Sequence, residues 1–217
     1  GSANLTVGDA SSTTFTGIIS GTGGLTKAGA GNLTLSGNNT YTGLTSITNG
    51  VLAYGINNAL ASGDVTVNGS TARWSLGGYS DTVGAVTLID GSITGTTGIL
   101  TGTDYAVQEG SISAILAGSV GITKTGTGTL TLSGTNTYTG QTNVNDGTLA
   151  VTVNDALGAN AAGTVIASGA TLDLQNVTYS TTEAITNNGG TLSTSTGTSS
   201  YAGVMTLAAN STIDVDG

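Results

Sequence analysis

Residues 24–53 read GLTKAGAGNLTLSGNNTYTGLTSITNGVLA, and residues 121–150 read GITKTGTGTLTLSGTNTYTGQTNVNDGTLA. The two stretches lie 97 positions apart and are identical at 19 of 30 positions. A long internal repeat of this kind is typical of proteins built from stacked supersecondary units. The fold of the chain therefore depends on the structure that one copy encodes.

Each copy contains short runs in which apolar and polar residues alternate. Leu33-Thr34-Leu35 and Leu130-Thr131-Leu132 are clear examples, and similar runs recur along the chain. Alternation with a period of two indicates a β-strand with one face buried. Gly and Asn punctuate the runs, as turns with positive φ require. No long stretch shows the apolar period of a helix, so the sequence predicts an all-β chain.

A parallel β-solenoid explains the short strands, the tandem repeat and the scarcity of aromatic residues better than a β-sandwich does. Stacked coils bury a few small aliphatic side chains each, and large aromatic rings are not expected to fit inside. Coils of roughly 20–25 residues would give about ten coils. We expect one right-handed, single-stranded parallel β-helix over residues 1–217, with internal repeats at 15–67 and 112–174 and a third copy beginning near residue 201. The chain is expected to be a fragment of a longer protein, and its opening Gly1-Ser2 is either a cloning scar or part of the natural sequence.

GGLTKAGAGNLTLSGNNTYTG (Gly23 to Gly43) and TKTGTGTLTLSGTNTYTG (Thr123 to Gly140) resemble the autotransporter-associated β-strand repeat, also called the passenger-associated transport repeat. The departures from the family pattern are few: Asn32 stands for Thr, Leu44 for a usual Gly, and Ile122 for Leu. The rest of the chain resembles the family more weakly. The resemblance is specific for a sequence family and much less specific for an activity.

The resemblance implies a right-handed parallel β-helix in the passenger of a type V secreted bacterial protein, or in a large bacterial exoprotein. It implies an extracellular or outer-membrane surface location and a structural stem that supports secretion and display. A covalently attached outer-membrane barrel is expected beyond the C-terminal end of this stretch. The first alternative is an adhesin that binds a glycan, or the surface of a host or neighbouring cell.

The composition argues against several functional classes. The 217 residues carry a net charge of −9, and the only bases are Lys27, Arg73 and Lys124, so no basic surface for nucleic acid is expected. The absence of His and Cys excludes Ser-His-Asp and Cys-His nucleophiles and zinc held by His or Cys. We expect no enzymatic activity, and no catalytic, cofactor or metal site.

The acidic residues leave a glycan-degrading β-helix as a weaker alternative. Such an enzyme needs two carboxyl groups facing one substrate. The tightest spacing is Asp214-x-Asp216, and Asp104 and Glu109 lie five residues apart in an expected loop.

Four side chains are candidate ligand contacts. Arg73 and Trp74 form one unusual pair, which is either a cation–aromatic platform for a ligand or a satisfied surface stack. Tyr41 and Tyr138 share a repeat position. They are either exposed glycan contacts or caps over a corner of the coil.

Other shared positions have plainer expectations. Lys27 and Lys124 are expected to be solvated at strand ends, and Asn39 and Asn136 to be turn or ladder residues. Thr-x-Thr pairs suggest an ice-binding alternative, but such a face needs the pair on every coil in one file, and the sequence shows it irregularly. Exposed coil ends are expected to favour end-to-end self-association.

Overall fold

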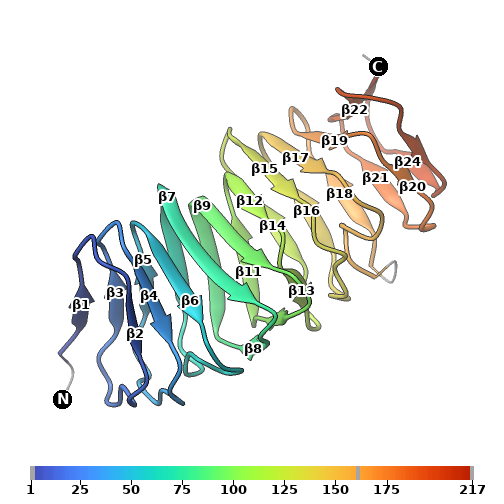
Figure 1. Ribbon diagram of the computed structural model, residues 1–217. Helices are drawn as coiled ribbons and strands as arrows, with labels where there is room; N and C mark the ends of the chain where they lie inside the picture. The colour runs from blue at the N-terminus through green and yellow to red at the C-terminus, as the bar shows by residue number, and fades with distance from the viewer. Residues whose placement is uncertain (1–2, 160–161, 216–217) are drawn as a thin grey trace. The chain divides into compact units, whose positions relative to one another are not determined.

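The computed structural model describes residues 3–159 and 162–215 (Figure 1). The chain is an all-β parallel solenoid of about ten turns, which confirms the fold class predicted from the alternating runs. The handedness of the coils stays a prediction. In the described part of the chain there is no helix with the length and hydropathy needed to cross a membrane.

Most strands are short, and the chain divides into two compact units, Gly1–Asp104 with Ser113–Ile115, and Tyr105–Ile112 with Leu116–Gly217. The strands up to β10 are β1 (Leu5–Val7), β2 (Thr13–Phe15), β3 (Leu25–Lys27), β4 (Asn32–Leu35), β5 (Thr45–Ile47), β6 (Val51–Tyr54), β7 (Val65–Gly77), β8 (Asp81–Thr82), β9 (Ala85–Gly95) and β10 (Ile99–Thr101). The remaining strands are β11 (Asp104–Val107), β12 (Gly110–Ile112), β13 (Ile115–Ala117), β14 (Ile122–Lys124), β15 (Thr129–Leu132), β16 (Thr142–Val144), β17 (Thr148–Val151), β18 (Thr164–Ile166), β19 (Thr171–Leu174), β20 (Thr178–Tyr179), β21 (Ile185–Asn187), β22 (Thr191–Thr194), β23 (Ser200–Tyr201), β24 (Met205–Leu207) and β25 (Thr212–Val215).

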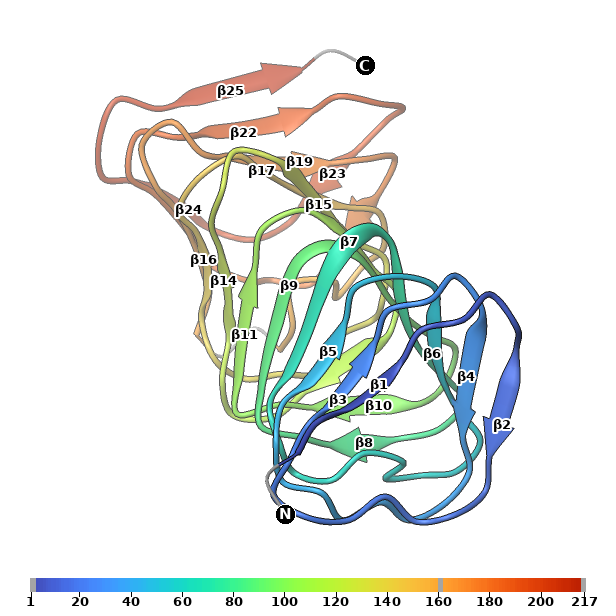
Figure 2. The same cartoon turned by 90° about the vertical axis from the view of Figure 1, so that its left-hand side faces the viewer.

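In the first unit, the first coils stack in constant register, whereas the pairing of β7 with β9 contains register shifts. β1, β3, β5 and β7 pair in parallel, as Figure 2 shows for the first three. Leu5 lies opposite Leu25, Leu25 opposite Thr45, and Thr45 opposite Val65. The constant offset keeps the alternation in phase, so that inward positions stack on inward positions.

In the second unit, two files of parallel strands lie on either side of a corner. One file contains β14, β16, β18, β21 and β24 (Figure 1), and the other contains β15, β17, β19, β22 and β25 (Figure 2). Apolar side chains stack along the second file, where Leu130, Leu149 and Leu172 lie opposite one another and are buried. This ladder of leucines is part of the hydrophobic core of the unit.

The interior also holds aromatic rings, so the prediction that large rings do not fit inside is wrong. Trp74 and Tyr138 are fully buried. Tyr54 packs edge-on against Trp74, with ring centroids 6.2 Å apart. Glycine makes room for Tyr138, because a Cβ at Gly158 would lie 2.6 Å from its ring. Most buried side chains are the aliphatic ones that the sequence predicts, and these aromatic rings are local exceptions.

Glycine shapes the corners between the two strands of a coil. Gly50 and Gly147 occupy equivalent corners with φ of +66° and +62°. A Cβ at Gly50 would lie 2.3 Å from the carbonyl oxygen of Gly29, and one at Gly147 would lie 2.5 Å from that of Gly126. Both the backbone angle and the close approach of the neighbouring coil therefore require glycine.

Candidate functional site

Lys27 lies in the interior of the solenoid. It is the third residue of β3, and the first and third residues of this strand face inward. Its side chain is only 2% exposed, so the prediction of a solvated lysine is wrong. Its Nζ donates hydrogen bonds to the carbonyl oxygen of Gly29 in its own coil and to that of Asn49 in the next coil, 3.1 Å away. The ammonium group therefore bridges the corners of two successive coils.

Lys124 repeats this arrangement in the second unit. It is fully buried, and its Nζ donates to the carbonyl oxygens of Thr125 at 3.0 Å, Gly126 at 2.7 Å and Asp146 at 3.0 Å. Burial lowers the pKa of the Lys124 ammonium, while the carboxylates of Asp146 and Glu109 act in the opposite direction. The lysine of each repeat thus acts as an internal hydrogen-bond donor for the backbone.

Asn39 and Asn136 are buried in the irregular segments that follow β4 and β15, and each connects three coils. The Oδ1 of Asn39 accepts from the backbone N–H of Ile19 at 2.8 Å, and its Nδ2 donates to the carbonyl of Ala59 at 2.6 Å. Asn136 makes the same two bonds, at 2.8 Å and 2.6 Å, to residues shifted by 97 positions. Each side chain satisfies the backbone of the coil before it and of the coil after it.

Tyr41 and Tyr138 point inward, so of the two alternatives the exposed glycan contact is wrong. Both are buried, and each hydroxyl lies 2.6 Å from the hydroxyl of a threonine four residues on, Thr45 and Thr142 respectively. Burial raises the pKa of Tyr41 to about 12. We call the equivalent pairs Lys27 and Lys124, Asn39 and Asn136, Tyr41 and Tyr138, and Thr45 and Thr142 the clamp residues.

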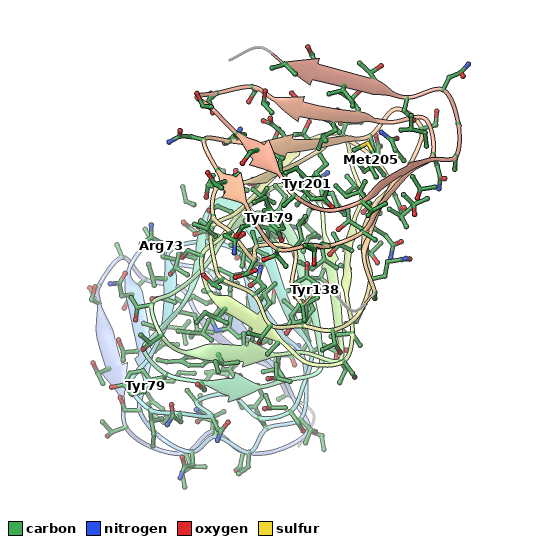
Figure 3. All side chains as sticks on the ribbon, turned by 90° about the vertical axis from the view of Figure 1, so that its right-hand side faces the viewer. Arg73, Tyr79, Tyr138, Tyr179, Tyr201 and Met205 are labelled. Carbon is green, nitrogen blue, oxygen red and sulfur yellow. The ribbon has the colours of Figure 1, made fainter. Side chains whose placement is uncertain are left out.

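Arg73 and Trp74 do not form the expected stack. They are consecutive residues of β7, and consecutive residues of a strand point to opposite faces. Arg73 is exposed, whereas Trp74 is fully buried beside Tyr54. Figure 3 shows the side chain of Arg73 in the first unit and those of Tyr138, Tyr179 and Tyr201 in the second. The Trp74 ring is thus part of the core.

Three buried carboxyl groups were not identified from the sequence: Asp173 in β19, and Asp81 and Glu183, which have the pKa raised by burial. Asp81 accepts from the backbone N–H of Leu60 at 3.0 Å, and burial raises its pKa. Glu183 is 1% exposed and accepts hydrogen bonds from the hydroxyls of Thr164 and Tyr179. Burial raises the pKa of Glu183 to about 7, against the opposing effect of these two bonds. Asp81 and Glu183 lie outside the main files of alternating strands, so no pattern in the sequence marked them.

A file of threonines follows the outer face of the second unit. Five of them lie directly opposite one another on consecutive coils, one on each of β15, β17, β19, β22 and β25: Thr129, Thr148, Thr171, Thr191 and Thr212. We call this file the threonine ladder. The neighbouring file, two positions further along each strand, contains different residues, of which the middle three are buried: Thr131, Ala150, Asp173, Ser193 and Asp214. The regular Thr-x-Thr pair of an ice-binding face is therefore limited to the first of these coils.

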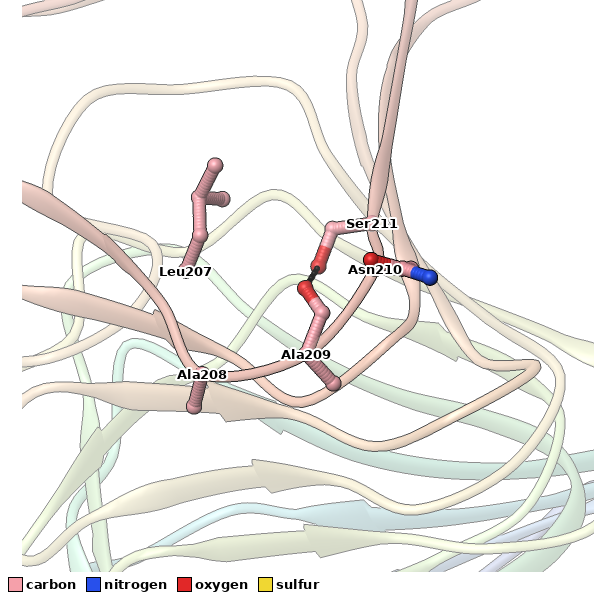
Figure 4. A pocket seen from close by; sticks show the side chains of 5 residues that line it. All are labelled: Leu207, Ala208, Ala209, Asn210 and Ser211. Carbon is pink, nitrogen blue, oxygen red and sulfur yellow. Dashed lines mark hydrogen bonds between the residues drawn. The ribbon is translucent and has the colours of Figure 1, made fainter.

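Two hollows occur at the two terminal coils. A pocket of about 660 Å³ lies at the turn between β24 and β25, lined by Leu207, Ala208, Ala209, Asn210 and Ser211 (Figure 4). A second, apolar hollow of about 340 Å³ is lined mainly by side chains of the first two coils, including Leu5, Phe15 and Leu35.

Carboxylates do not gather at either hollow in a way that suggests catalysis. Asp9 is the one acid that lines the second hollow. Asp214 is exposed on the last strand, and its predicted companion Asp216 lies outside the described residues. Among the described residues, no group of three or more His, Cys, Asp or Glu side chains could hold a metal ion.

A comparison with protein families agrees with this geometry. The family model described as the passenger-associated-transport-repeat matches residues 25–53 and 122–151. No curated protein and no solved structure matches the chain. The two matched stretches contain all the clamp residues of both copies. The chain thus carries two passenger-associated transport repeats, as the two quoted stretches predicted.

Proposed function

We propose that this chain is a structural stem of a bacterial secreted or surface-displayed autotransporter passenger, with no catalytic role. One observation supports the proposal above all. Both repeats bury the same polar side chains, and these side chains form hydrogen bonds to neighbouring coils or to each other. Lys27 and Asn39 each bond to the backbone of a following coil, as do Lys124 and Asn136. The match to the passenger-associated transport repeat supports the same proposal.

The clamp residues suit a stem for a physical reason. A backbone carbonyl or N–H that is buried without a partner costs about 1–3 kcal/mol. The lysine and asparagine of each copy supply such partners at the corners, where the strand ladder ends. Because each coil contacts mainly its neighbours, an ordered coil can template the next. A chain built in this way can fold stepwise, from one coil to the next.

A display experiment tests this function. The chain is placed between a reporter domain and an outer-membrane anchor, and surface reporter is measured by antibody binding on intact cells. Lys27→Met with Lys124→Met is expected to reduce the displayed reporter several-fold, because both repeats lose corner donors. Arg73→Met is the matched control, since Arg73 is exposed, and it should leave display unchanged. Equal display of the wild type, the double lysine variant and Arg73→Met would contradict a role of the clamp residues in the stem.

The threonine ladder favours a second candidate function, an adhesin that binds glycans. Threonine hydroxyls both donate and accept hydrogen bonds, and sugars offer the same groups in return. Thr148 and Thr171 are partly exposed at the centre of the file, on the outside of the coils.

A glycan array tests this second function. Reproducible binding is expected for the purified chain, and Thr148→Val with Thr171→Val should abolish it, whereas Thr26→Val in the first unit should not. An array without hits would reject the adhesin. If the chain shows thermal hysteresis and no sugar binding, the threonine ladder binds ice and not glycans.

A further inference from the structure

Asn49 is held at the corner between β5 and β6 by two hydrogen bonds to its side-chain amide oxygen. The backbone N–H of Gly50 donates to Oδ1 at 2.8 Å. The hydroxyl of Thr71, on the next coil, donates to the same Oδ1 at 2.8 Å. Asn49 is half-buried, and Gly50 places no side chain over the amide.

We propose that Asn49 is a site of spontaneous deamidation, in which the next residue of the chain attacks the side-chain amide. The Gly50 nitrogen forms a bond to Cγ of Asn49, and the Cγ–Nδ2 bond breaks. The proton of the attacking nitrogen is carried by solvent to the departing group, which leaves as ammonia. The cyclic imide is then opened by one water molecule at either carbonyl, which yields Asp or isoaspartate. The overall change is consumption of one water and release of one ammonia.

The two donors on Oδ1 favour this reaction in the folded chain. The bond from Gly50 keeps the attacking nitrogen next to the amide group, which replaces a conformational search by a fixed geometry. The Thr71 hydroxyl stabilises the negative charge that develops on Oδ1 as the new bond forms, in the manner of an oxyanion hole. Thr71 is exposed, so it does this without being part of the core.

The second repeat shows that the product fits the fold. Asp146 occupies the position equivalent to Asn49, followed by Gly147. The Oδ1 of Asp146 accepts from the Gly147 N–H at 2.8 Å, the same distance as in the first repeat, and the φ angles of the two glycines differ by only a few degrees. Deamidation of Asn49 to Asp would thus reproduce a corner that the protein already contains. It would also place a carboxylate near Lys27, as Asp146 lies near Lys124.

The chain provides its own internal references. Asn68-Gly69 and Asn188-Gly189 are the other two Asn-Gly sequences, and both asparagines are exposed. The purified folded chain is aged in mildly alkaline buffer, and peptide mapping follows the mass gain of about 1 Da at each site. Asn49 is expected to convert at least about threefold faster than Asn68 and Asn188. In a denaturant the three rates should become similar, because only the fold distinguishes the sites.

Thr71→Val tests the role of the hydroxyl while keeping the shape of the side chain. It should slow conversion of Asn49 at least about threefold and leave the other two sites unchanged. The folded chain should also yield a larger share of Asp over isoaspartate than the denatured chain, since isoaspartate lengthens the backbone where Lys27 bonds to the Asn49 carbonyl. A folded chain in which Asn49 stays intact, or converts no faster than Asn68 and Asn188, overturns the proposal. So does a Thr71→Val variant with an unchanged rate at Asn49.

Discussion

Lys124→Met is expected to lower the free energy of unfolding by about 3 kcal/mol, because three backbone carbonyls lose their donor and each costs about 1–3 kcal/mol when left partly unsatisfied. Methionine is flexible and of similar length, so it fills the space that the lysine stem occupies. The loss therefore reports on the hydrogen bonds of Nζ to Thr125, Gly126 and Asp146 more than on packing.

The measurement combines denaturant unfolding with hydrogen exchange. Repeat proteins lose stability locally, so exchange should accelerate most at the amides of β14 to β17, which surround the corner. Lys27→Met is the matched variant in the first repeat, and Arg73→Met is the surface control, with an expected change within about 0.5 kcal/mol. If Lys124→Met leaves the free energy of unfolding unchanged or raises it, the desolvation of the buried ammonium costs at least as much free energy as its hydrogen bonds contribute.

The fold could be predicted because it rests on patterns that repeat. Alternating runs such as Leu130-Thr131-Leu132 indicated strands, and the glycines of Asn49-Gly50 and Asp146-Gly147 indicated turns. In the structure these turns join the two strands of one coil, β5 to β6 in the first repeat and β16 to β17 in the second, with nearly the same glycine φ. Because positions 97 residues apart are equivalent, the sequence predicted the same corner in both repeats.

The direction of the lysines could not be predicted in the same way. β3 and β14 have only three residues, Leu-Thr-Lys and Ile-Thr-Lys, so the alternation that places Lys inward rests on a single preceding apolar residue. A charged residue at a strand end is normally solvated. What reverses this is the set of carbonyl groups around Nζ: the lysine's own corner supplies Gly29 or Gly126, and the stacked neighbouring coil adds Asn49 or Asp146.

The threonine ladder was missed for a different reason, which is the unequal length of the coils. Thr148 lies opposite both Thr129 and Thr171, yet it is separated from them by 19 and 23 residues. A search at one fixed period cannot align these positions. Glu183 was missed because its burial is produced by side chains from several coils, among them Thr164 and Tyr179.

Glu183→Gln is expected to remove a pH dependence from the stability of the second unit. The pKa of Glu183 is raised from 4.5 to about 7, so the folded chain binds its proton more tightly than the unfolded chain does. The stability that goes with the bound proton is complete below the unfolded pKa and is lost as the pH rises through the folded pKa. Between those two values the wild-type chain should lose about 3 kcal/mol through this one carboxyl group.

Glutamine should behave like the protonated acid, because it is neutral and its amide oxygen can still accept from the Thr164 hydroxyl. Glu183→Gln is therefore expected to match the wild type at acidic pH and to be more stable above neutral pH, by up to about 3 kcal/mol. Denaturant unfolding and hydrogen exchange of β18 to β22 on both sides of the window measure the difference, and Asp214→Asn serves as the exposed control. Asp81, the other acid whose pKa burial raises, is unchanged in both chains, so its effect cancels in the comparison. Parallel pH profiles for wild type and Glu183→Gln would mean that Glu183 titrates as a solvated carboxyl, and that the coils around it open to water before it ionises.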